Sequence, residues 1–139
     1  MAFSHGLNAV FKLHDGTSLR DLSPAGTSCS LDLSKDTVET TAFGSTSKTF
    51  IPGLRDASFS IEGARDATIE GYVWAAFTNA AAAGLAWEYY PEGTASGKVK
   101  YSGNCHLTGG PGPSASTDDS VKWGAEAQVT GDVTRALVP

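Results

Sequence analysis

The sequence is poor in the residues and motifs that enzymes and metal sites require. Its 139 residues include two cysteines and three histidines. His5, His14 and His106 stand far apart, in no metal-ligand spacing. Cys29 and Cys105 form no C-x-x-C pair, so a structural zinc site is not expected. Neither the G-x-S-x-G elbow nor the G-x-x-x-x-G-K-[ST] phosphate loop occurs. We therefore predict no catalytic residue, no metal and no cofactor.

Basic residues and long apolar runs are also scarce. Ten Lys and Arg face fifteen Asp and Glu, for a net charge of −5. A protein that grips nucleic acid by counterion release needs a basic surface, so this balance disfavours DNA binding. The longest apolar run, around 73–85, is too short and too polar to cross a bilayer. Residues 1–6 show no signal-peptide pattern, and we expect a soluble protein made in the cytoplasm, with no membrane partner.

What the sequence has instead is strand-like alternation. Segments 9–14, 27–34, 55–63, 85–90, 98–107 and 120–134 alternate apolar and polar residues, and Asp15-Gly16 predicts a hairpin turn. In segment 27–34 we expect Cys29, Leu31 and Leu33 to point inward. A helical pattern occurs at Asp66–Ala82, with Asp66 as its N-cap and an apolar stripe of Ile69, Tyr72, Val73, Ala76 and Phe77. The length suits one domain over residues 1–139. We expect a mainly β, antiparallel β-sandwich or rolled sheet with one flanking α-helix. Both cysteines are expected as buried, reduced thiols, and a disulfide would require neighbouring strands.

The most distinctive segment runs from Lys35 to Gly53. It is rich in Ser and Thr, carries one isolated aromatic residue, Phe43, and ends in Phe50-Ile51-Pro52-Gly53. We interpret it as a long loop, and its Ser, Thr and Gly content predicts disorder before assembly. A loop of this length in a small domain usually has a function outside its own fold. A solvated surface loop, or one folded over its own core, is the alternative.

The order of these motifs resembles the major tail proteins, or tail tube proteins, of long-tailed, non-contractile bacteriophages. The resemblance rests on D-T-x-E-T-T-x-F-G from Asp36, S-K-T-x-I-P-G-L-x-D-A from Ser47, and the alternating strand that follows. Tyr90-Pro91-Glu92-Gly93, Tyr101-Ser102-Gly103, Trp123 to Gly131 and then Val133-Thr134-Arg135 also fit the family. The match runs in register from about Phe11 onward.

The resemblance implies a structural virion protein that polymerises as stacked hexameric rings into a tail tube, the conduit for DNA ejection. Its partners would be other copies of itself and the tape measure, tail terminator and distal tail proteins. Double-stranded DNA would pass through without specific binding, and assembly would take place in the host cytoplasm. The loop at about 35–53 would contact the adjacent ring through Thr37, Glu39, Thr40, Thr41, Phe43, Phe50, Ile51 and Pro52.

An acidic lumen wall would keep DNA phosphates from sticking. The candidate lumen-facing carboxylates lie on polar strand faces, where ordinary solvent exposure is the alternative: Asp32, Asp56, Glu62, Glu126 and Asp132.

Two other functions stay open. One is the tube of a related machine: a contractile tail, a secretion system or a gene-transfer particle. The other is a carbohydrate-binding sandwich whose sugar platform would be built from Trp74, Trp87, Trp123, Tyr89 and Tyr90, although the spacing of these residues also suits core packing.

Overall fold

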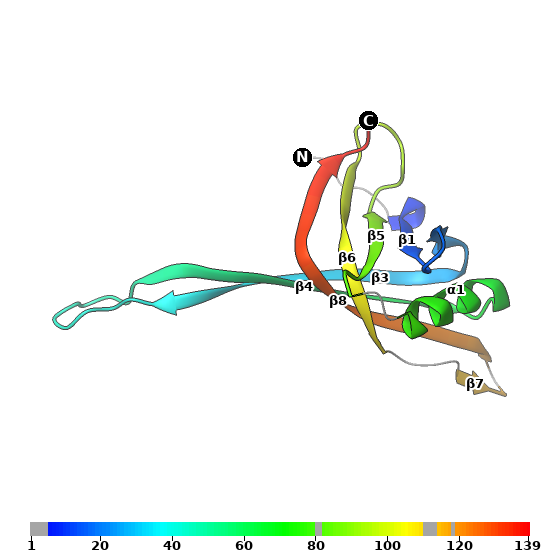
Figure 1. Cartoon of the computed structure of the whole chain (residues 1–139), viewed down its shortest axis with the longest axis horizontal. Helices are drawn as coiled ribbons and strands as arrows, with labels where there is room; N and C mark the ends of the chain where they lie inside the picture. The colour runs from blue at the N-terminus through cyan, green and yellow to red at the C-terminus, as the bar shows by residue number, and fades with distance from the viewer. Residues whose placement is uncertain (1–5, 80–81, 110–113, 118) are drawn as a thin grey trace.

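The structure is a computed structural model that describes residues 6–79, 82–109, 114–117 and 119–139. Eight strands, one α-helix and two short 3-10 helices make up this part of the chain (Figure 1). In chain order they are η1 (Gly6–Asn8), β1 (Val10–His14), β2 (Leu19–Asp21), η2 (Ser23–Ala25), β3 (Gly26–Glu39), β4 (Phe50–Ala64), α1 (Ala67–Thr78), β5 (Leu85–Tyr90), β6 (Val99–Gly109), β7 (Ser114–Ser116) and β8 (Asp119–Leu137).

All the strands belong to one antiparallel sheet in the order β2-β1-β5-β6-β8-β4-β3, with β7 paired to β8. The long strand β8 joins two parts of the sheet, β2-β1-β5-β6 on one side and β4-β3 on the other. Its first part pairs with β4, from Ala64 opposite Lys122 to Ser58 opposite Gln128, and most of its length pairs with β6. Figure 1 shows β8 bending sharply between them. The expected fold class, a mainly β antiparallel structure with one flanking helix, is confirmed.

The core lies where the sheet rolls back on itself. Strands β1 and β4 are not hydrogen-bonded neighbours, yet the ring centroids of Phe11 and Phe59 are 4.8 Å apart. Trp87 of β5 completes the aromatic group, with its centroid 5.2 Å from that of Phe59. The alternation predicted these inward positions correctly: Ala57, Phe59 and Ile61 of β4 are buried, and so are Trp123, Ala125, Ala127 and Val129 of β8.

The helix α1 is shorter than the predicted Asp66–Ala82. Asp66 is its N-cap, as expected, and accepts hydrogen bonds from the backbone N–H groups of Thr68 and Ile69. The helix ends at Thr78, with Asn79 as its C-cap; residues 80 and 81 lie outside the described part. Ile69 and Ala76 are buried against the sheet, whereas Phe77, which we expected on the buried stripe, is 47% exposed.

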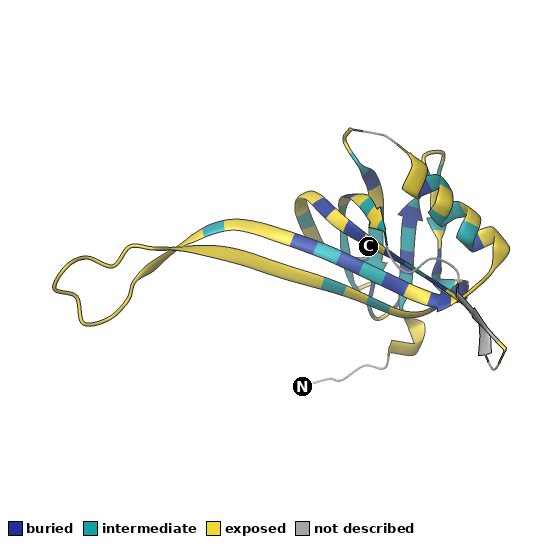
Figure 2. Cartoon of the chain, turned by 90° about the horizontal axis from the view of Figure 1, so that it is seen from below, coloured by how far each residue is buried: buried dark blue, intermediate teal, exposed yellow. Residues whose placement is uncertain are grey.

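The segment 35–53 is a β-hairpin arm rather than the long loop that we expected. Strand β3 continues to Glu39 and β4 starts at Phe50, so that only residues 40–49 connect them. The ladder runs out to Glu39 opposite Phe50. Thr37 and Val38, which we expected in a polar loop, are β-branched residues that suit the strand they form. Figures 1 and 2 show the arm projecting far from the body as two strands alone.

Both cysteines are free thiols, as expected. They lie on β3 and β6, which are not neighbours in the sheet. Cys105 is fully buried and Cys29 is half-buried. Burial raises the pKa of both thiols to about 12, so they act as small apolar side chains. No helix in the described part of the chain is long and apolar enough to span a membrane.

Candidate assembly surface

The projecting arm, defined here as residues 33–54, exposes an unusual amount of apolar side chain. Figure 2 shows that exposed residues dominate the arm, while buried positions appear on β4 only where it reaches the body. The exposed large apolar residues of the arm are Leu33, Val38, Phe43, Phe50, Ile51 and Leu54. A two-stranded hairpin with nothing packed against it is marginally stable in water. A cluster of exposed apolar residues usually marks an interaction site. The arm is therefore a candidate contact surface.

The apolar residues are distributed over both faces of the arm. Val38 lies directly opposite Ile51 in the ladder, so these two side chains share one face. The next pair outward, Glu39 and Phe50, points to the other face. Val38, Phe50 and Ile51 are each about half exposed, at 53%, 53% and 52%. A partner that covered either face would bury apolar area that the free chain leaves in water.

The tip of the arm, residues 40–47, is ordered by threonine hydroxyls. The backbone N–H of Thr40 donates to the carbonyl of Thr49 at 2.7 Å, and their hydroxyl oxygens are 3.0 Å apart. The Thr41 hydroxyl accepts from the Thr49 N–H at 3.0 Å. Thr40 and Thr41 thus stabilise the tip through hydrogen bonds within the arm. The sequence had led us to expect them only as residues that contact the adjacent ring.

A tight turn displays Phe43 at the end of the arm. The Ser45 N–H donates to the Ala42 carbonyl at 3.2 Å, and Gly44 takes a positive φ of 84° that side chains disfavour. Phe43 at the corner of this turn is fully exposed. An aromatic ring held in water by its own turn is positioned to contact something other than its own chain.

Pro52 and Gly53 set the course of the strand where the arm leaves the body. The ladder shifts register between Lys35 and Thr37, where Gly53 and Leu54 oppose Asp36 alone, as in a β-bulge. A Cβ added at Gly53 would lie 3.1 Å from Asp36, so the close approach favours glycine here. Pro52 and Gly53 therefore lie within β4, next to the bulge, and not in a loop that precedes the strand.

Four of the five candidate carboxylates share one face of the sheet, which we call the acidic face. In the ladders Asp32 lies opposite Ser58, Asp56 opposite Ser34, Glu62 opposite Ser28, and Glu126 opposite Ser60. Side chains paired in this way point to the same side, away from buried Ala57, Phe59 and Ile61 of the same strand. Its neutral members are mostly serines; Lys122 lies at its end, opposite Ala64.

The fifth candidate, Asp132, does not belong to this group. It lies beyond the β4–β8 ladder and after Gly131, whose φ is 78°. Its carboxylate accepts a hydrogen bond from the Arg55 guanidinium at 3.0 Å, an exposed ion pair that offsets its charge. The structure therefore brings together Asp32, Asp56, Glu62 and Glu126, and sets Asp132 apart.

The proposed sugar platform is not formed. Trp87 and Trp123 are core residues, 0% and 3% exposed, and Tyr90 is buried as well. Trp74 lies on α1, where it stacks on Phe77 at a centroid distance of 5.9 Å. Trp74 is exposed, but Trp87, Trp123 and Tyr90 are buried and cannot join it in a common surface for a sugar ring, so the arrangement favours the core-packing interpretation.

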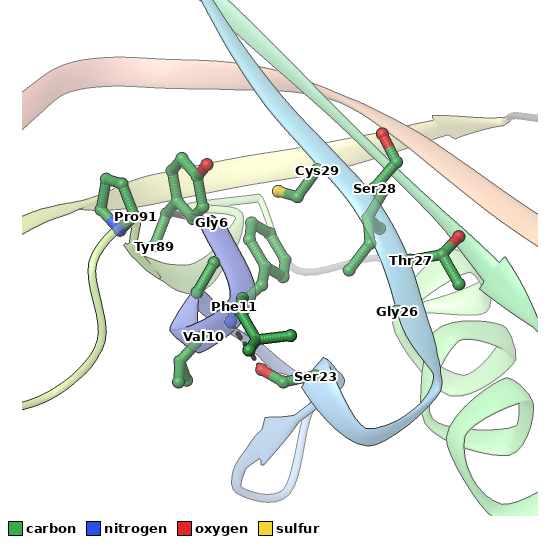
Figure 3. Close-up of a pocket in the computed structure, with 13 residues that line it drawn as sticks. Gly6, Val10, Phe11, Ser23, Gly26, Thr27, Ser28, Cys29, Tyr89 and Pro91 are labelled. Carbon is green, nitrogen blue, oxygen red and sulfur yellow. Dashed lines mark hydrogen bonds between the residues drawn. The ribbon is translucent and has the colours of Figure 1, made fainter. Parts of the chain in front are cut away.

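Sequence analysis missed a pocket in the body of the protein. Among the residues that the structure describes, the sheet does not close on itself: β3 pairs with β4 alone, and β1 pairs only with β2 and β5. A cavity of about 550 Å³ lies in this open seam, and we call it the seam pocket. Figure 3 shows its lining, which includes Val10, Phe11, Cys29 and Tyr89. No local motif could have revealed it, because its walls come from segments distant in the chain.

Known structures share this fold over nearly the whole chain. A chain of a native gene transfer agent virion, and one from the tail of an empty gene transfer agent particle with C6 symmetry, each align with a TM-score of 0.78 and 15% identity. Each alignment covers 96% of this chain and 99% of that one. A chain of the sheath–tube complex of an extracellular contractile injection system aligns with a TM-score of 0.70 and 14% identity, over 98% and 93%.

The fold of the chain is thus the one found in tail tube proteins. No protein-family model and no curated protein matches the sequence.

Proposed function

We propose that this chain is a structural virion protein, the subunit of a phage-type tail tube. The observation that carries the proposal is the apolar two-stranded arm, which projects from a body with the tail tube fold. Copies would join in hexameric rings, and the arm at about 35–53 would reach the adjacent ring. Contact with a neighbouring copy would bury the side chains of Val38, Phe50 and Ile51, which are exposed in the free chain.

Free strand edges support sideways association. Within the described part of the chain, β3 pairs on one side only, and β8 pairs only with β6 after Gln128. Unpaired edges of this kind template pairing with another chain. A head-to-tail contact between two different surfaces of one protein closes into a ring when the rotation per step allows it. The arm then supplies a second contact along the tube axis.

The acidic face is our candidate for the lumen wall. Asp32, Asp56, Glu62 and Glu126 would repel DNA phosphates, so that the duplex slides through the tube without specific binding. A conduit for DNA needs no catalytic group, and we propose no enzymatic activity. The natural partners are a tape measure, a tail terminator and distal tail proteins, in a virion assembled in the host cytoplasm.

Two kinds of machine fit this subunit. The motif order favours the non-contractile tail of a siphophage. The similarity to a gene transfer agent tail and to contractile injection systems favours the tube of a related machine. A sheath gene beside the gene for this chain would indicate a contractile system, whereas adjacent tape-measure and tail-chaperone genes without a sheath would indicate the flexible tail.

Electron microscopy of the purified protein tests the proposal. We expect rings or tubes with six-fold symmetry as the concentration rises, or on addition of preformed tail-tip complexes that initiate assembly. Protein that stays monomeric under both conditions, or that is found in its native particle away from the tube wall, would refute the proposed function.

A further inference from the structure

The seam pocket is open, uncharged and partly apolar. None of the described residues that line it carries a charge, and its walls include Leu7, Val10, Phe11, Ile61 and Tyr89. In Figure 3 the Cys29 thiol and the Tyr89 ring project into the space between β3 and β1. Pockets of about 300–1,000 Å³ hold small organic groups, so a cavity of about 550 Å³ has room for an aromatic ring and its neighbours.

The tip of the arm has matching chemistry. Residues 40–47 read TTAFGSTS and contain no charged side chain, and the charged residues that flank them are Glu39 and Lys48. The turn at Ala42–Ser45 pushes Phe43 outward, where nothing covers it. An uncharged knob with one aromatic ring suits an uncharged pocket, because neither surface loses the hydration of an ion when they meet.

The tip cannot fill the pocket of its own chain. Cys29 in the pocket and Glu39 at the base of the tip belong to the same strand, β3. About ten residue steps of extended chain separate them by roughly 33 Å. Figure 1 shows the arm leading away from the β1 end of the body. Only a second copy can bring this knob to this pocket.

We propose that the arm of one copy inserts Phe43 into the seam pocket of a neighbouring copy. The inference rests on the proposed function and specifies which surface receives the arm. The contact joins two different surfaces of the same chain, which is the kind of contact that can propagate from copy to copy into rings or stacks. Aromatic residues buried in a partner's pocket carry a large share of interface energy, which gives this one side chain control over assembly.

Site-specific photo-cross-linking of the full-length protein tests the insertion. Phe43 is replaced by p-benzoylphenylalanine, which keeps an aromatic ring, and assembled tubes are irradiated. Mixing isotope-labelled and unlabelled protein separates adducts between copies from those within one copy. We expect adducts between copies on peptides that contain Leu7, Val10 or Tyr89. The same probe at Trp74, an exposed aromatic residue of α1, is the matched control and should not label these peptides.

A second measurement uses the concentration at which assembly begins. Phe43→Ala should raise this concentration about 30-fold, because it removes a phenyl ring buried on contact. Phe43→Leu should raise it less than about 5-fold, since the pocket still receives an apolar group. The melting temperature of the monomer should not change, because Phe43 is fully exposed in the free chain.

The outcomes separate this inference from the proposed function. Tubes whose Phe43 adducts lie on α1 or on the acidic face, or that assemble equally well with Phe43→Ala, overturn the insertion and leave the tube subunit standing. Failure of the unmodified protein to assemble under any condition overturns both. Adducts in the seam pocket together with the expected shift in threshold support the insertion.

Discussion

The apolar face of the arm formed by Val38 and Ile51 should add to the strength of assembly beside Phe43. Full burial of such a side chain is worth about 1.5–3 kcal/mol. About half of each is exposed in the free chain, at 53% and 52%, so a partner that covers both gains about 2 kcal/mol per contact. We expect the double variant Val38→Thr and Ile51→Thr to weaken each contact about 30-fold. Threonine keeps the β-branch that stabilises the hairpin while its hydroxyl makes burial unfavourable.

The assay is the concentration at which particles form, followed by sedimentation velocity and light scattering. The melting temperature of the monomer should barely change, since neither residue is part of the core cluster. A matched control is Leu19→Thr, at a partly exposed leucine of β2 on the body. The reasoning is refuted if the double variant assembles at the wild-type concentration, or if the control shifts the threshold as far as the double variant does.

Three further predictions concern the turn of the first hairpin, the acidic face and the arm. The pKa of Asp15 is lowered to about 2, from an ordinary 3.8, mainly by the N–H groups of Ser18 and Thr17. The free energy of unfolding that the ionised Asp15 contributes should be present above about pH 4 and lost as the pH falls through 2. In urea unfolding, Asp15→Ala should therefore lower the free energy of unfolding by about 1 kcal/mol at pH 7 and by almost nothing at pH 2. In co-sedimentation assays, assembled tubes of the double variant Asp32→Lys and Glu126→Lys should retain double-stranded DNA in low salt and release it in high salt. Tubes of the control variant Asp132→Lys should not retain DNA. Tubes of the double variant that do not bind DNA would contradict the assignment of the acidic face to the lumen. In the monomer, amide hydrogens of the arm should exchange far faster than those of β8, and they should become protected on assembly. Strong protection of the arm amides in the monomer would contradict the interpretation of the arm as a hairpin without a packing partner.

The sequence predicted the body of the protein well because one face of each strand is buried. Ala57, Phe59 and Ile61 alternate with polar residues because the core removes one side of β4 from water. Asp66 was recognisable as a cap because capping depends on residues that are neighbours in the chain. Where local chemistry and burial agree, a single sequence is informative.

The arm was misread for the opposite reason. Outside the body neither face of β3 and β4 is buried, so the alternation that reveals a strand disappears. Leu33, predicted to point into the core, is 60% exposed because β3 has already passed the end of the core there. The open seam lay beyond sequence reasoning too, since the pairing order of the sheet decides which strands remain unjoined.

The contrast between body and arm also accounts for how such a subunit can be made without premature assembly. The body buries its own core, so each copy folds independently of the others. The arm is paired within its own hairpin but projects away from the body. A contact of about 2 kcal/mol cannot by itself hold two copies together against the cost of association. In the proposed ring, however, several arms would meet their receiving surfaces at once, and every contact after the first would be effectively intramolecular. Weak single contacts and strong collective ones make growth from an existing ring favourable while free copies stay apart.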